Sequence, residues 1–298
     1  MELFIGTWDP AWGYTWVARG FGKLYALRSL AGGSFLCVEG KEYPTSGQNS
    51  CHITILDRQA VVSDYTSGTL SLFPLDGNGI PAGEPEILHF EGCGPHPVRQ
   101  TSPHIHSSWL SPDGDSLVVV DLGTDRLYRF PVHDGRVAKE GKEVFQMPNG
   151  CGPRHCAFGE SSLYVSTELS DEVLVLDWPS MELKQRIVVN KMLPGGGGHL
   201  LLSPDKRFLY ASSRLQNDGI AVFTIGENGS IEPAGYFNTE SHPRHFCLSP
   251  DGELLLVACK DGDCVQVFGR SQENGLLSGP IELIMIDKPV FVDCYEKD

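Results

Sequence analysis

The sequence predicts an all-β fold, a seven-bladed β-propeller built from short antiparallel strands. Two observations carry this prediction. The tripeptide Ser-Pro-Asp begins at Ser111, Ser203 and Ser249, and these serines are 92 and 46 residues apart. A degenerate copy, from His155 to Trp178, fills the expected place between the first two. A repeat of about 46 residues that contains several short apolar runs is typical of propeller blades.

Each repeat predicts four strands in the same order. In the copy that starts at His199, the apolar run after the histidine is the expected innermost strand. The Ser-Pro-Asp turn follows, because Pro presets φ and Asp bonds its own backbone. Residues 208–211 and 220–223 are the expected second and third strands, and residues 216–219 form the polar turn between them. A weak fourth strand ends the sheet.

The blade count is seven. Innermost strands are expected near Tyr14, His52, His106, His155, His199, His245 and Pro289. The last of these lies too close to the chain end for a full blade. We therefore expect the run at residues 3–8 to pair beside it, so that N- and C-terminal strands close an incomplete seventh blade and leave no open edge there. No linker or change of composition divides the chain, which predicts a single propeller domain over residues 1–298.

Composition narrows the possible partners and location. The net charge of -15 argues against nucleic acid and against an anionic membrane surface, since both require a basic face. We expect no signal peptide and no membrane span, because no apolar run approaches the roughly 18 residues that a span needs. The nine cysteines lack C-x-x-C spacing, which favours small buried side chains in a reducing compartment. A cytoplasmic location is predicted.

The candidate site residues precede or begin the innermost strands. The innermost strands of a propeller line its central channel, so these positions are expected to converge on one channel mouth. Histidines recur there at what reads as one repeat position, and arginines lie beside them. The candidates are His52, Arg99, His104, His106, Arg154, His155, His199, Arg244 and His245. Glu168, at the end of a second strand, is expected at the same level.

Each candidate also has a structural interpretation. A histidine could bond the backbone of a neighbouring blade, and an arginine could form a salt bridge between blades. Arg154 and Arg244 both stand in Pro-Arg-His. An arginine presents a fixed fork of donors that suits a carboxylate or a phosphate, so an anion between two such forks is the functional alternative.

Metal and cofactor sites are not expected. His104 and His106 alternate on an extended segment and face the same side, as a metal-binding pair would. However, the predicted channel mouth is rich in arginine and poor in carboxylates, which favours an anionic substrate over a divalent ion. The glycines 195–198 lack the Lys-Ser/Thr of a nucleotide loop, and there is no Gly-x-Ser-x-Gly elbow for a serine hydrolase.

Several ordered motifs resemble one known family. The runs SPHIHSSWLSPDG, VVVDLGTDRLYRF, GPRHCAF, SPDKRFLYASSR, IAVF and HPRHFCLSPDG resemble the seven-bladed lactonase propellers, which include bacterial 6-phosphogluconolactonase and the fungal carboxymuconate cycloisomerase. The resemblance covers nearly the whole chain from about Tyr14 onward. It departs at the start, where the family's usual strands after the opening Gly-Thr are absent, and at GGGGH, where an acidic residue commonly precedes the histidine.

The resemblance implies an enzyme, a carboxylic-ester hydrolase that opens a sugar-acid lactone in the pentose phosphate pathway, with a small anionic lactone as its partner. It also implies roles. Arg154 and Arg244 would hold the anionic group and stabilise the oxyanion, His106 would act as general base or acid, and Glu168 would orient a neighbour. His52, Arg99, His104, His155, His199 and His245 would bind substrate.

Two alternatives to the hydrolase stay open. A carboxymuconate-type cycloisomerase also makes or breaks a lactone C–O bond beside an anionic group. A non-catalytic propeller that binds a sugar acid or a protein at its rim is the alternative from a different class of function.

Overall fold

The computed structural model describes residues 43–190 and 195–294 in full, together with the backbone of four earlier strands. The chain forms two compact units, Met1–Gly152 and Pro153–Asp298. All regular elements in the described part are strands, and no helix there is long and apolar enough to cross a membrane. That the whole chain is one domain stays a prediction.

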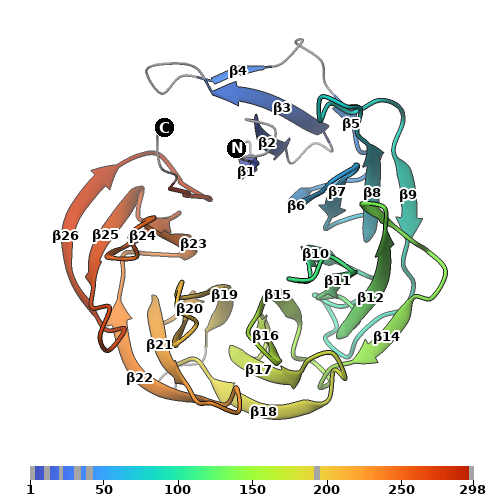
Figure 1. Ribbon diagram of the computed structural model, residues 1–298. Coiled ribbons are helices and arrows are strands. Elements are labelled where there is room, and N and C mark those ends of the chain that lie inside the picture. Colours follow the sequence, from blue (N-terminus) through green and yellow to red (C-terminus); the bar gives the residue numbers. More distant parts are fainter. Residues whose placement is uncertain are drawn as a thin grey trace. The chain divides into compact units, whose positions relative to one another are not determined.

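The first unit contains three antiparallel sheets (Figure 1). The first sheet has β1 (Phe4–Asp9), β2 (Tyr14–Arg19), β3 (Lys23–Ser29), β4 (Phe35–Cys37) and β5 (Tyr43–Pro44). The second has β6 (Ser50–Leu56), β7 (Gln59–Asp64), β8 (Thr69–Pro74) and β9 (Glu86–His89). The third has β10 (Ile105–Leu110), β11 (Ser116–Asp121), β12 (Arg126–His133), β13 (Arg136–Val137) and β14 (Glu143–Gln146).

The second unit contains three four-stranded antiparallel sheets. They are β15 (Pro153–Phe158), β16 (Ser162–Thr167), β17 (Glu172–Asp177) and β18 (Leu183–Val188); β19 (Gly196–Leu202), β20 (Phe208–Arg214), β21 (Gly219–Ile225) and β22 (Ile231–Asn238); and β23 (Pro243–Leu248), β24 (Leu254–Cys259), β25 (Cys264–Arg270) and β26 (Leu277–Met285). The first strands of these sheets, β15, β19 and β23, lie side by side (Figure 1).

The N-terminal strand differs from the prediction. The run expected to close the last blade is β1, and it pairs with β2 as the first strand of the first sheet, so that sheet does not start near Tyr14. Residues 289–294, the expected C-terminal closing strand, form no strand in the part of the chain that the structure describes. Closure of a seventh blade by the two ends of the chain stays a prediction.

The core of each unit lies between successive sheets. Strand side chains alternate in direction, so one strand serves two interfaces. In β20, Leu209 packs with Leu200 and Val175 toward the preceding sheet. Tyr210 packs with Phe246 and Val257 toward the following sheet. The apolar runs of the repeat are therefore buried on both faces.

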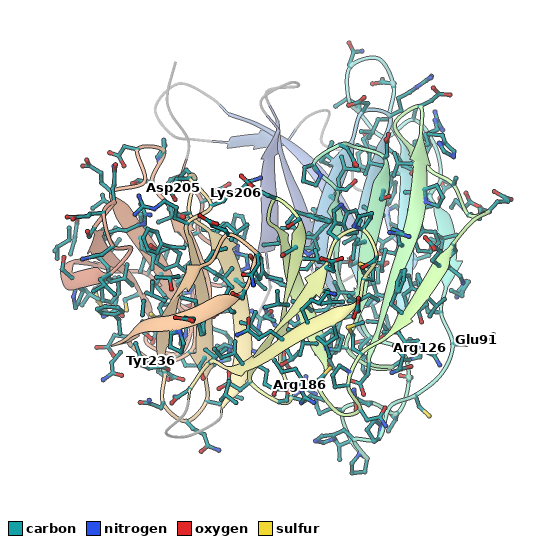
Figure 2. The ribbon with its side chains drawn as sticks, turned by 60° about the horizontal axis from the view of Figure 1, so that its bottom comes forward. Glu91, Arg126, Arg186, Asp205, Lys206 and Tyr236 are labelled. Carbon is teal, nitrogen blue, oxygen red and sulfur yellow. The ribbon has the colours of Figure 1, made fainter. Side chains whose placement is uncertain are left out.

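The Ser-Pro-Asp turns have the predicted chemistry. Ser111 Oγ donates to Asp113 Oδ1 at 2.5 Å, and the Asp115 amide donates to the same oxygen at 3.1 Å. Gly114 takes φ 78°, and Lys206, at the equivalent place after Asp205, takes φ 56° (Figure 2). The turn therefore recurs because the Asp side chain supports the left-handed residue that follows it.

The connections between sheets are held by buried aspartates. Asp125 accepts hydrogen bonds from the Gly150 amide at 2.6 Å and the Gly152 amide at 2.7 Å, and Gln100 Nε2 donates to it at 2.7 Å. Arg126, the next residue, donates to Glu91 O at 3.1 Å (Figure 2). Asp125 thus fixes both the loop that enters its own sheet and the loop that leaves it.

Six of the eight described cysteines are buried and all eight are free thiols, as the sequence predicts of small core side chains. Burial raises the pKa of the Cys156 thiol well above its usual value, so it is protonated and unreactive at neutral pH.

We predict that Asp125→Ala lowers the free energy of unfolding by about 3 kcal/mol, because several buried donors lose a charged acceptor. Urea denaturation followed by circular dichroism measures the loss. Asp115→Ala, at an exposed turn position, is the matched control and should change stability by less than about 0.5 kcal/mol. Equal stability of the two variants would contradict the assigned role of Asp125.

Candidate functional site

A β-bulge interrupts the first strand at the same place in five of the six described sheets. Between β10 and β11, Ile105 pairs with Asp121 and Ser107 with Val120, so His106 is the extra residue. The same shift leaves Arg154 extra in β15 and Arg244 extra in β23. A bulge re-aims a side chain away from the regular alternation of the strand. His106, Arg154 and Arg244 therefore occupy one equivalent position.

This register corrects the expected repeat position of the histidines. The sequence places His106 in one set with His52, His155, His199 and His245. In the structure His52, His155 and His245 follow the bulge, and in β10 that place belongs to Ser107. Counted back from the turn that follows, His106 is five residues before Ser111, whereas His199 and His245 are four residues before Ser203 and Ser249, so the spacing in the sequence already carries this offset. His106 is thus the counterpart of the arginines.

Arg154 and Glu168 form a buried ion pair in the second unit. Arg154 Nε lies 3.1 Å from Glu168 Oε2, and the exposed fractions of the two side chains are 2% and 12%. This ion pair agrees with the expectation that Glu168 orients a neighbouring residue. Glu168 follows β16 directly, so the end of the second strand brings it to the bulge of the first.

Arg214 completes this cluster, and sequence reasoning missed it. Its Nη2 lies 3.0 Å from the same oxygen, Glu168 Oε2. The guanidinium also donates to Gly196 O at 3.2 Å and to Gly197 O at 2.8 Å. A single carboxylate therefore lies between two buried arginines. The signal that could have revealed Arg214 is its place at the end of the second strand of its sheet, which corresponds to the place of Glu168 after β16.

The glycine run is explained by close backbone contacts. A Cβ on Gly197 would lie 2.1 Å from Thr167 O, and one on Gly195 would lie 2.1 Å from Arg214 O. The amides are also in use, since Gly195 N donates to Asp171 Oδ2 and Gly197 N donates to Glu168 O. The glycines thus let β19 approach β16 and β20 closely, and two of their amides are not available to a phosphate.

His242 extends the cluster from Arg214 toward the surface. Arg214 Nη1 and His242 Nε2 are 3.2 Å apart, and His242 Nδ1 lies 2.8 Å from Asp261 Oδ2. Lys260 Nζ contacts the other oxygen of Asp261 at 2.9 Å. Burial and the positive charge of Arg214 lower the pKa of His242 below its usual value, in spite of Asp261. Sequence reasoning missed His242 and Asp261 because both lie in turns.

Three of the predicted histidines form a row of rings in the second unit. His155 Nδ1 and His199 Nδ1 are 2.8 Å apart, and His199 stacks on His245 with ring centroids 4.2 Å apart. His245 packs against Phe291, which belongs to the predicted closing segment. Since His155 and His199 are buried, this geometry gives them a packing role. Substrate contact by these three rings stays a prediction.

In the first unit, Tyr65 contacts three of the predicted residues. His104 stacks on the Tyr65 ring with centroids 4.5 Å apart, His106 meets it edge-on at 5.7 Å, and Arg99 Nη2 donates to its hydroxyl at 3.1 Å. His104 and His106 thus contact one ring, as the prediction that they share a face requires. His52, by contrast, packs against Trp109.

The charge of the second-unit cluster favours an anion. Arg154, Arg214 and the half-buried Arg244 carry three positive charges, and Glu168 carries one negative charge beside the first two. The positive charge of Arg244 also contributes to the lowered pKa of His242. Among residues 43–190 and 195–294, no group of three His, Cys, Asp or Glu side chains is placed to hold a metal ion. Such a cluster can bind a carboxylate or phosphate and can stabilise a developing oxyanion.

Comparison with known proteins gives consistent matches. A family model described as "Lactonase, 7-bladed beta-propeller" matches residues 31–294. A 6-phosphogluconolactonase of Bacillus subtilis is 32% identical over 260 residues, which cover 83% of this chain and 73% of the relative. A 6-phosphogluconolactonase of Formosa agariphila is 33% identical over 255 residues, 80% of this chain and 72% of the relative.

A crystal structure from Bacteroides fragilis, described as a candidate 6-phosphogluconolactonase, superposes with a TM-score of 0.90. It is 30% identical, and the match covers 97% of this chain and 85% of that one. The predicted all-β class, the seven-bladed propeller and the resemblance to the lactonase propellers are confirmed by these matches.

We predict that Glu168→Ala destabilises the protein by about 3 kcal/mol, because it leaves two buried arginines without their shared carboxylate. Glu143→Ala is the control. Glu143 is 52% exposed in its pair with Arg129, so its loss should cost less than about 1 kcal/mol. Chemical denaturation of both variants makes the comparison, and a Glu168→Ala variant as stable as the control is the result that contradicts a tight cluster.

Proposed function

The chain belongs to the lactonase family of seven-bladed β-propellers, and from that premise we propose that it hydrolyses the lactone of a phosphorylated sugar acid, as a 6-phosphogluconolactonase does. The observation that carries the proposal is the buried Arg154–Glu168–Arg214 cluster, to which Arg244 adds a positive charge that reaches His242. This surplus of arginine suits a substrate that is anionic before the reaction and gains a further negative charge during it.

The reaction makes two demands on the site. The oxygen of a water molecule bonds to the lactone carbonyl carbon, and the carbonyl electron pair moves onto its oxygen. The bond from that carbon to the ring oxygen then breaks, and the ring oxygen takes a proton. The site must therefore stabilise an oxyanion and must move one proton from water toward the leaving oxygen.

We assign stabilisation of the oxyanion to the arginines. Arg154 and Arg244, at equivalent bulges, would hold the anionic group and the oxyanion, and Glu168 would keep Arg154 and Arg214 in a fixed orientation. Fixed donors stabilise a developing charge without reorganising at the moment of reaction, which is the usual source of large rate effects.

For proton transfer, His106 stays the proposed general base. Its support is the bulge of β10, which gives it the same repeat position as the two arginines, and the Tyr65 ring, which fixes its orientation. Arg99 and His104 contact the same tyrosine and stay proposed substrate-binding residues, as does His52. A role in a sugar-phosphate pathway of the cytoplasm is part of the same proposal.

We predict that the wild type accelerates hydrolysis of 6-phosphoglucono-δ-lactone above the spontaneous rate, and that Arg154→Lys lowers kcat about 10²-fold because an ammonium cannot replace the guanidinium fork. Arg186→Ala is the control, since Arg186 is a half-exposed surface residue (Figure 2). Proton release in a weakly buffered solution, corrected for the uncatalysed rate, gives kcat for the wild type and for each variant. No acceleration by the wild type would refute the lactonase proposal.

His106→Ala should lower kcat by about 10²–10⁴-fold, because His106 would act in proton transfer, and a melting curve shows whether the variant, which loses a buried side chain, stays folded. Wild-type kcat in this variant would remove His106 from the mechanism without touching the lactonase proposal. A muconate lactone assay, followed by ultraviolet absorbance, tests the cycloisomerase alternative. Binding of 6-phosphogluconate without turnover of either lactone would support a non-catalytic propeller.

A further inference from the structure

Hydrogen-bonding capacity fixes the protonation state of His242. An arginine nitrogen can only donate, so at the 3.2 Å contact with Arg214 Nη1 the His242 Nε2 atom must accept. A carboxylate can only accept, so at the 2.8 Å contact with Asp261 Oδ2 the His242 Nδ1 atom must carry the proton. The geometry therefore requires a neutral imidazole with its proton on Nδ1.

The charged groups around His242 act in opposite directions, and the net effect lowers its pKa. Arg214, at the end of β20, and Arg244, two residues along the chain, oppose a positive ring, and both lower its pKa. Asp261, in the turn after β24, favours a positive ring, but Lys260 contacts its other oxygen and draws off part of its charge. Asp218, before β21, accepts the backbone amide of His242 at 2.8 Å.

The backbone of His242 is also held in an uncommon conformation. Its φ is 63°, in the left-handed region that non-glycine residues rarely adopt. The hydrogen bond to Asp218 supports this conformation and aims the ring at Arg214. Strain held by specific contacts occurs preferentially where a side chain must be placed accurately.

We propose that His242 is a positioning residue for Arg214. The neutral ring accepts a hydrogen bond from the guanidinium and holds it against Glu168. Protonation of the ring displaces the guanidinium and weakens anion binding. Protonation would place an N–H opposite an N–H, and a positive charge opposite a positive charge. The expected change in KM rests on the proposed function, whereas the hydrogen bond between His242 and Arg214 does not.

The sign of the pH effect follows. The pKa of His242 is lowered, so the ring is neutral above its folded pKa and becomes charged as pH falls through it, below the usual value of 6.5. Arg214 is then held at neutral pH and released in acid. The effect should appear chiefly in KM, because Arg214 shares Glu168 with Arg154, the residue assigned to the anionic group.

The test compares two substitutions of one residue. His242→Gln places an amide oxygen near the Nε2 position, so it can accept from Arg214 but cannot take up a proton. His242→Ala removes the acceptor. We expect His242→Ala to raise KM about 10- to 100-fold at pH 7.5, as expected from loss of one hydrogen bond to a charged group. We expect His242→Gln to recover most of this loss and to abolish the rise of KM between pH 7 and pH 5.

Two kinetic outcomes overturn the proposal. A loss of about 10²-fold or more in kcat in His242→Gln would make His242 a general base and not a positioning residue. A wild-type rise of KM in acid that persists unchanged in His242→Gln would show that another group titrates. The substrate phosphate titrates in the same way with every variant, so its effect on KM cancels when the variants are compared. His133→Gln, at an exposed histidine, is the matched control.

A spectroscopic measurement separates failure of this inference from failure of the proposed function. Long-range ¹H–¹⁵N spectra of the intact protein should show His242 at pH 7.5 as the neutral tautomer protonated on Nδ1. This result supports the inference even if no lactone is hydrolysed. A ring protonated on Nε2 at pH 7.5 contradicts it whatever the activity.

Discussion

The fold depends on a carboxylate that accepts backbone amides from the loop entering the next sheet. Asp125 binds the loop before β15, Asp171 binds Gly195, and Asp218 binds the His242 amide. These loops cannot pair in a sheet, so their buried amides need another acceptor. The same aspartates thereby set where each first strand begins. The placement of the cluster residues follows from these bonds.

The scaffold could be predicted from sequence because its signals are local and repeated. The Ser-Pro-Asp turn and the apolar runs on either side depend on neighbouring residues alone, and three copies make the period plain. The bulges could not be predicted, since one extra residue in a strand leaves no trace in the composition. His106 differs from the other histidines in its distance from the Ser-Pro-Asp turn, a difference that matching by residue type alone overlooks. The expectation that Glu168 orients a neighbouring residue agrees with its ion pair with Arg154.

Arg214, His242 and Asp261 were missed for a different reason. Each lies at or just beyond the end of a strand, among residues whose ordinary role is to make turns, and their contacts join separate sheets of the second unit. Sequence spacing within one repeat cannot reveal a contact between repeats. Tyr65 is the same case in the first unit, since it contacts His104 and Arg99 from a neighbouring sheet.

Few sets of neighbouring groups can stabilise the buried charges of this cluster. Burying one carboxylate between two guanidinium groups is costly unless nearly every donor finds an acceptor. Gly196 and Gly197 supply carbonyl oxygens to Arg214, and at Gly197 only glycine permits the close approach to Thr167 O. A neutral histidine supplies a further acceptor without adding negative charge, whereas a carboxylate at that place would neutralise the arginine. An arginine fully neutralised by protein groups has little attraction left for an anionic ligand. The choice of histidine therefore keeps the cluster both satisfied in its hydrogen bonds and positive in its charge.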